Sequence, residues 1–93
     1  MNNRYDFFKY FNFIEIEIDE LFERCEGLKL ASIERMSKCA FNLMQIGLDK
    51  YDVYDVVLVN PSILLKNPDA LETDLSKLGA NAKEKIILDP FCV

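Results

Sequence analysis

One stretch decides the fold class: Val53-Tyr54-Asp55-Val56-Val57-Leu58-Val59. It is almost continuously apolar and rich in β-branched valine, which is typical of a strand buried on both faces. Asn60-Pro61 follows and is expected to end the strand, because proline cannot donate a hydrogen bond to a sheet. The alternative is a helix that directs Leu48, Tyr51, Tyr54 and Leu58 inward.

A helix and a second strand are predicted after this stretch. Asn67-Pro68-Asp69 is typical of a helix start, with asparagine as the N-cap, and Gly79 is expected to follow the helix end. Residues 84–88 (Glu-Lys-Ile-Ile-Leu) predict the second strand, which Asp89-Pro90 closes. The short apolar segment 62–66 is expected to form a turn or a 3₁₀ helix.

Two helices are predicted before the first strand. Residues 4–26 are assigned to one helix, because apolar side chains recur at steps of four and three at Phe7, Phe11, Ile14, Ile18, Leu21 and Cys25. Alternation in residues 13–18 is the competing indication of an edge strand. A second helix is predicted over residues 29–46 and ends at Gly47. The two would form a helical hairpin around Gly27.

These elements predict a single domain over residues 1–93, of the α+β class. An N-terminal helical hairpin would be followed by strand–helix–strand, with the small sheet covered by helices, and an all-α fold is the alternative. Two strands leave two unpaired edges, so a homodimer that extends the sheet is also expected.

Negative charge is concentrated in one short run. The chain has 93 residues with 11 basic and 16 acidic side chains, a net charge of −5. Six acids lie between Glu15 and Glu26, where Arg24 is the only base, and Asp49, Asp52 and Asp55 form a second acidic cluster. Such a charge distribution repels phosphate and attracts basic surfaces. We therefore expect a protein partner with a basic surface and no direct binding of nucleic acid.

The composition excludes much catalytic chemistry. Histidine is absent, and so are the glycine patterns that bind phosphates. Cys25, Cys39 and Cys92 are odd in number and widely spaced, which is typical of reduced thiols in a cytoplasmic protein. No apolar run approaches the ~18 residues of a membrane span. We expect no catalytic residues, metal, cofactor or membrane contact; an enzyme using a carboxylate pair or Cys92 ranks last.

Aromatic residues gather before the acidic run. Tyr5, Phe7, Phe8, Tyr10, Phe11 and Phe13 are six of the eleven aromatics. They are expected to pack on the core, and the alternative is that some of the rings face a partner. The predicted partner-binding residues are Tyr5, Phe8, Tyr10, Glu15, Glu17, Asp19, Glu20, Glu23, Asp49, Asp52 and Asp55.

Two functions follow from these patterns. The first is an acidic, non-enzymatic inhibitor that occupies a basic surface of a nuclease or another nucleic-acid-binding protein. In size, acidity and lack of catalytic residues the chain resembles phage anti-defence proteins and toxin-immunity proteins, a likeness of composition that carries no motif. The alternative is a regulatory or scaffold module that binds a partner, or itself, through apolar helical surface.

Overall fold

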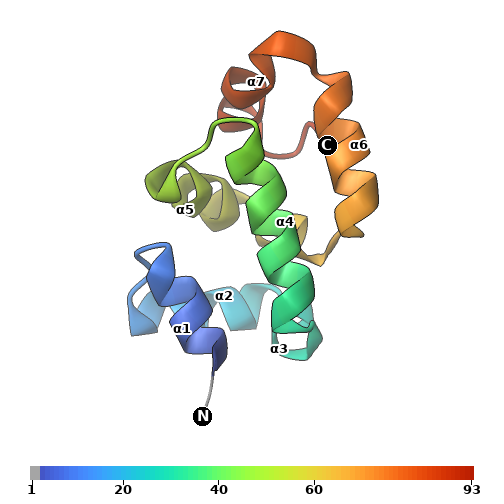
Figure 1. Ribbon diagram of the computed structural model, residues 1–93. Coiled ribbons are helices and arrows are strands. Elements are labelled where there is room, and N and C mark those ends of the chain that lie inside the picture. Colours follow the sequence, from blue (N-terminus) through green and yellow to red (C-terminus); the bar gives the residue numbers. More distant parts are fainter. Residues whose placement is uncertain (1–2) are drawn as a thin grey trace.

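Every regular element of the chain is a helix in the computed structural model, which describes residues 3–93 (Figure 1). The elements are α1 (Asn3–Tyr10), α2 (Glu15–Arg24), α3 (Gly27–Leu30), α4 (Ile33–Gln45), α5 (Lys50–Val59), the 3₁₀ helix η1 (Pro61–Leu65), α6 (Pro68–Lys77), the 3₁₀ helix η2 (Gly79–Asn81) and α7 (Ala82–Leu88). Since these residues contain no strand, the α+β prediction is wrong and the all-α alternative is the one observed.

The stretch that decides the fold lies within α5. Asp49 caps this helix: its side chain accepts a hydrogen bond from the backbone of Asp52, and the Asp52 side chain accepts one from the backbone of Asp49. Val53, Val56 and Val57 are buried, because α5 packs against α4, α7 and η1. A continuous apolar run therefore marks a helix covered on several sides here, and tertiary packing overrides the weak β preference of valine.

The second predicted strand, residues 84–88, lies within α7. Ala82 and Ile86 are buried four residues apart, which is helical spacing. The homodimer prediction rested on the exposed edges of a sheet, and that argument falls because residues 3–93 contain no sheet.

The predicted helix over residues 4–26 is instead two helices. The chain turns at Asn12, which adopts a positive φ of 73° and is among the few residue types that tolerate this conformation. After the turn, the Glu17 side chain accepts a hydrogen bond from the backbone of Ile14 at 3.0 Å and caps α2. The turn lets the Phe13 ring return against the Phe8 ring, at 5.7 Å between centroids. One straight helix could not bury the aromatic side chains of both segments.

The predicted helix over residues 29–46 is also divided. Ser32 separates α3 from α4, and its hydroxyl accepts a hydrogen bond from the backbone of Arg35 at 3.1 Å. The predicted hairpin around Gly27 is wrong, because Gly27 begins α3 rather than ending the preceding helix. A Cβ atom at Gly27 would lie 2.7 Å from a methyl carbon of Leu65, so α3 and η1 make a close approach here.

Three local predictions are confirmed. The Asn67 side chain accepts hydrogen bonds from the backbones of Asp69 and Ala70 and so caps α6. Gly79 follows the helix end with a positive φ of 80°. The apolar segment after Asn60 forms η1.

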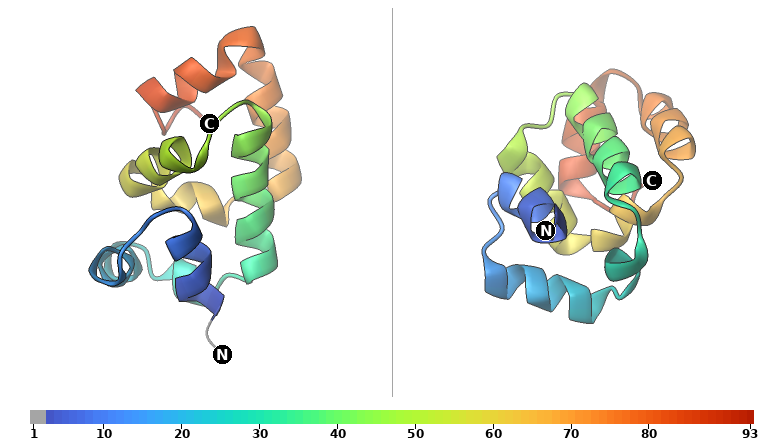
Figure 2. Two further views of the ribbon diagram at one scale, coloured as in Figure 1. Left: turned by 60° about the vertical axis from the view of Figure 1, so that its left-hand side comes forward. Right: turned by 60° about the horizontal axis from the view of Figure 1, so that its bottom comes forward.

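The second half of the fold contains two similar helix pairs, α4–α5 and α6–α7. Gly47 and Gly79, both with positive φ, follow the first helix of each pair, and proline follows the second helix at Pro61 and Pro90. The residues before these prolines have similar backbones, with φ −130° and ψ 77° at Asn60, and φ −142° and ψ 90° at Asp89. The pairs stack, α6 on α4 and α7 on α5 (Figure 2).

The first three helices cover one end of this stack. Helix α4 is central, because it contacts α1, α5, α6 and η1 and buries Met36, Cys39, Ala40 and Leu43. Helix α1 lies beside α4, and the two run in the same direction, while α2 lies across the far side of α1 (Figures 1 and 2). This placement leaves two surfaces for a partner: the outer side of α2 and the channel between α1 and α4.

Candidate functional site

The acidic run forms one exposed side of α2. Glu15, Asp19 and Glu23 are four residues apart, so they form one row along the helix, and Glu20 lies in the adjacent row. All four side chains are exposed. Among residues 3–93 their one ion pair joins Glu15 to Lys9 at 3.8 Å.

The only base of this run makes no ion pair with these four acids among the described residues. One guanidinium nitrogen of Arg24 donates to the backbone carbonyl of Leu58 at 2.8 Å, and another lies 3.5 Å from that of Val59. These are carbonyls at the C-terminal end of α5, where a cation is favourable. Arg24 therefore stabilises the end of α5, and within residues 3–93 Lys9, beside Glu15, is the one ion-pair partner of the four acids of α2.

Isoleucine interrupts the acidic side. Ile16 is 66% exposed, in the row of Glu20, and Ile14 just before the helix is also exposed. The sequence pattern placed Ile14 in a buried stripe and gave Ile16 no role. The placement of Ile14 is wrong, because the turn at Asn12 shifts the helical register of the residues that follow. An apolar side chain ringed by carboxylates is the kind of anchor that protein interfaces use.

Glu17, a predicted site residue, is half-buried and structural. Its carboxylate caps α2 and also accepts a hydrogen bond from the hydroxyl of Tyr54 on α5. That hydrogen bond, with partial burial, raises the pKa of Tyr54.

The three predicted aromatic site residues differ in exposure. Phe8 is completely buried, so it belongs to the core. The hydroxyl of Tyr5 donates a hydrogen bond to Asp19, and this bond raises the pKa of Tyr5. Tyr10 is 53% exposed, and the Lys50 ammonium lies 4.4 Å from the centre of its ring. Of the three, Tyr10 offers the most surface to a partner.

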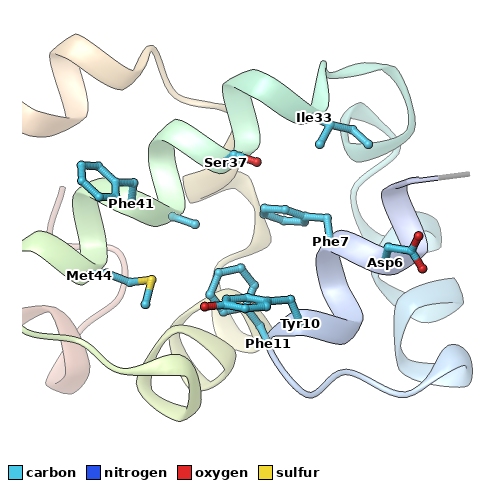
Figure 3. A pocket seen from close by; sticks show the side chains of 9 residues that line it. Asp6, Phe7, Tyr10, Phe11, Ile33, Ser37, Phe41 and Met44 are labelled. Carbon is cyan, nitrogen blue, oxygen red and sulfur yellow. The ribbon is translucent and has the colours of Figure 1, made fainter.

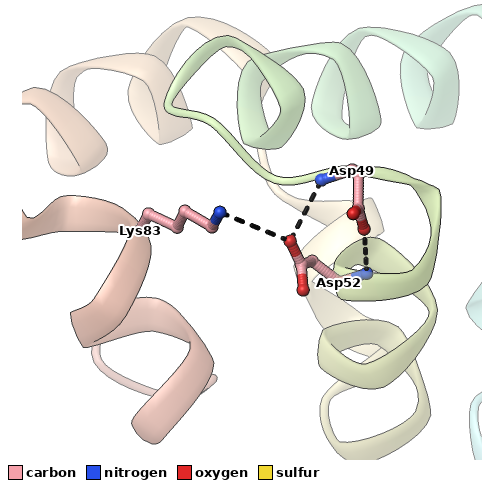
Figure 4. Close-up of polar contacts among 3 residues, drawn as sticks. All are labelled: Asp49, Asp52 and Lys83. Atoms are coloured by element: carbon pink, nitrogen blue, oxygen red, sulfur yellow. Dashed lines mark hydrogen bonds and ion pairs between the residues drawn. The ribbon is translucent and has the colours of Figure 1, made fainter.

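The second acidic cluster is divided between roles. Asp49 and Asp52 form the reciprocal cap of α5, and the Lys83 ammonium lies 3.9 Å from Asp52 (Figure 4). Asp55 is exposed one turn further along the helix. Two of the three acids therefore stabilise the helix start and its link to α7.

An apolar groove of about 540 Å³ runs between α1 and α4 (Figure 3). Its lining is mostly aromatic and aliphatic: Asp6, Phe7, Tyr10, Phe11, Ile33, Ser37, Ala40, Phe41 and Met44. Phe41 on the α4 wall is 59% exposed, and its ring lies at the outer edge of that wall, directed away from Phe7 and Tyr10 of the α1 wall. Exposed aromatic rings on both walls make this concave surface strongly apolar.

Sequence reasoning found Tyr10 but missed the α4 wall of the groove. Phe41, an aromatic residue within the helix predicted over residues 29–46, was the available signal that this helix has a second apolar side. The pairing of that side with α1 depends on the turn at Asn12 and the break at Ser32.

Two of the three thiols have raised pKa values. Burial raises the pKa of Cys39, whose Sγ lies 3.2 Å from the backbone carbonyl of Lys66. Burial and the nearby Asp89 raise the pKa of Cys92. Raised values disfavour the thiolate, which is the nucleophilic form. In the described part of the chain, no three cysteine or carboxylate side chains are grouped so that they could hold a metal ion.

Comparison with known proteins gives no relative: no family model, no curated protein and no solved structure matches this chain. None of the helices within residues 3–93 combines the length and the apolar character that a membrane span requires.

Proposed function

We propose that this protein is a non-enzymatic interaction module that binds an amphipathic helix of a partner protein in the groove between α1 and α4. The observation that carries the proposal is the groove, whose two walls present Tyr10 and Phe41 to solvent across an apolar floor. Helix-in-groove recognition uses such channels, into which the partner inserts apolar side chains spaced by three and four residues.

The energetics favour an apolar occupant. Burial of apolar surface contributes about 25 cal/mol per Å², and aromatic rings offer the largest areas. A volume of about 540 Å³ has room for several side chains. Met44 at the end of the α4 wall is flexible enough to adapt to different side chains.

Two chemical features of the chain support a non-enzymatic function. The chain contains no histidine, and two of its three thiols have raised pKa values. We also propose the cytosol as the compartment, because all three cysteines are free and disulfides are rare there.

A capture experiment with matched variants tests the groove. The tagged chain, Phe41→Ala and Phe91→Ala would each be incubated with native lysate at about 500 mM salt, where charge attraction is screened. Both phenylalanines are about 60% exposed, but only Phe41 lines the groove. A partner lost by Phe41→Ala and kept by Phe91→Ala supports the proposal. Equal capture by all three proteins, or by none, contradicts it.

A second candidate function is the acidic inhibitor. It is favoured by the four exposed carboxylates on one side of α2 and by the diversion of Arg24 to α5. In this candidate α2 would occupy a basic surface, such as the nucleic-acid site of a nuclease, with Ile16 as its apolar anchor.

Charge reversal separates this candidate from the first. We expect Glu20→Lys with Glu23→Lys to slow association, and the loss to shrink as salt rises from about 50 to about 500 mM. Glu72→Lys with Glu84→Lys is the control, because it makes the same charge change at exposed positions of α6 and α7. If both double variants associate at the same rate, the α2 surface is not the binding site.

A further inference from the structure

The groove between α1 and α4 is not uniform in charge. Asp6 lies at the end where α1 and α4 begin, close to Ile33, and Met44 lies at the other end of the α4 wall (Figure 3). Tyr10, one turn after Asp6, has the Lys50 ammonium over its ring. The groove therefore has a carboxylate at one end and a cation beyond it along α1.

Asp6 is the only charged side chain that lines the groove, and it has no ion pair within residues 3–93. Two lysines that are adjacent in sequence to lining residues already form ion pairs with glutamates. Lys9 pairs with Glu15 at 3.8 Å, and Lys38 pairs with Glu34 at 3.4 Å. An occupant of the groove thus meets one carboxylate that is free to accept a charged hydrogen bond.

We propose that the occupant is an amphipathic helix that carries one lysine or arginine beside its apolar stripe, and that this residue pairs with Asp6. The proposal rests on the proposed function, since it names the partner chemistry of the same groove. The cation belongs at the Asp6 end, because a second cation further along would approach Lys50. A helix with basic residues along its whole length is therefore a poorer fit than one with a single basic residue.

Synthetic peptides test this chemistry. The parent probe is an amphipathic helix of about 16 residues with a leucine stripe and only alanine and glutamine elsewhere. A series of peptides then replaces one glutamine at a time, beside the stripe, by lysine. Binding is measured by titration into the isotope-labelled protein, which locates the affected backbone amides.

We expect one position in the series to bind about two- to fivefold more tightly than the parent, the range of a partly exposed ion pair. The gain should vanish in Asp6→Asn and persist in Glu20→Gln, which removes the same charge from α2. Shifts should map to α1 and α4 in each case.

Two results would overturn the proposal. The first leaves the proposed groove function intact, and the second removes it as well. If the parent peptide shifts the amides of Phe7 and Phe41 but no lysine improves binding, or the gain survives in Asp6→Asn, the ion pair is wrong and the groove function stands. If none of the peptides shifts those amides, the groove function fails as well.

Discussion

Tyr54 on α5 donates its hydroxyl hydrogen bond to the carboxylate of Glu17 on α2, a residue 37 positions earlier in the chain. The bond joins the N-terminal helices to the stacked helix pairs. The same carboxylate caps α2 through the backbone of Ile14. One glutamate thus fixes both the start of α2 and its position against α5.

This hydrogen bond predicts a pH-dependent stability. The hydrogen bond and partial burial raise the pKa of Tyr54 above its ordinary value of 10.0. Since the folded-state pKa is the higher one, the stabilisation is fully present below about pH 10 and is lost as the pH rises through the folded-state pKa. Tyr54→Phe should lower the free energy of unfolding by about 0.5–1.5 kcal/mol at pH 7.

Urea unfolding at pH 7 and above pH 11 measures this effect. The difference between the wild type and Tyr54→Phe should shrink at the higher pH, whereas Tyr51→Phe, at an exposed position without this bond, should match the wild type at both. A difference that does not change with pH would show that the lost contact is only packing.

The valines of α5 predict contrasting stability losses. Val57 is buried and Val59 on the same helix is half-exposed. Val57→Ala should cost about 1–3 kcal/mol, since it leaves a cavity that the higher helix propensity of alanine offsets only slightly. Val59→Ala should change stability by less than about 0.5 kcal/mol. Chemical denaturation checks both, and equal losses would contradict the burial pattern of this helix.

The cap of α6 predicts a stability loss without any change in the core. Asn67 satisfies two backbone N–H groups, and alanine there should cost about 0.5–2 kcal/mol. Asn81→Ala is the matched control, because the Asn81 side chain makes no capping hydrogen bond to α7. In thermal unfolding, Asn67→Ala should have a clearly lower melting temperature than Asn81→Ala. Identical melting temperatures would show that the Asn67 cap does not contribute to stability.

The three cysteines predict an order of chemical labelling. Cys92 is exposed, Cys25 is half-buried and Cys39 is completely buried. In native buffer a thiol reagent should modify Cys92 first, and Cys39 should react only as the protein unfolds. Mass spectrometry of timed samples gives the order, and Cys92→Ser should remove the fastest phase. Rapid native labelling of Cys39 would mean that α4 and η1 separate readily.

The parts of the fold that depend on local signals could be predicted from the sequence. The Asn67 cap, the end of α6 before Gly79 and the 3₁₀ helix that begins at Pro61 each depend on a few neighbouring residues. The α5 helix could not be predicted in this way. Its valines favour a strand locally, and only the covering elements α4, α7 and η1 make the helix the better state.

Some features of the candidate site could likewise be predicted from the sequence, and others could not. Exposure of the acids of α2 was predictable from the charge run, and so was the availability of Tyr10. The groove was not, since its walls are separated in sequence and meet only because the chain turns at Asn12 and again at Ser32. The roles of Glu17, Asp49 and Asp52 in capping also require the positions of their backbone partners.

The repeated helix pair carries a consequence for self-assembly. One side of α5 faces α7. On this side the Asp52 carboxylate lies near the Lys83 ammonium, and the Asn60 side-chain amide donates a hydrogen bond to the carbonyl of Pro90 at 2.9 Å. Val56 lies four residues from both Asp52 and Asn60, on the same side of the helix, and is buried. Aligning the two pairs on their prolines places Asn81, Lys85 and Asp89 at the matching positions of α7, and all three are exposed. An added pair would have to bury the Lys85 ammonium where the first pair buries a valine, at a large desolvation cost. Lys85 therefore disfavours growth of the stack beyond α7, the kind of open-ended addition that would produce a fibre.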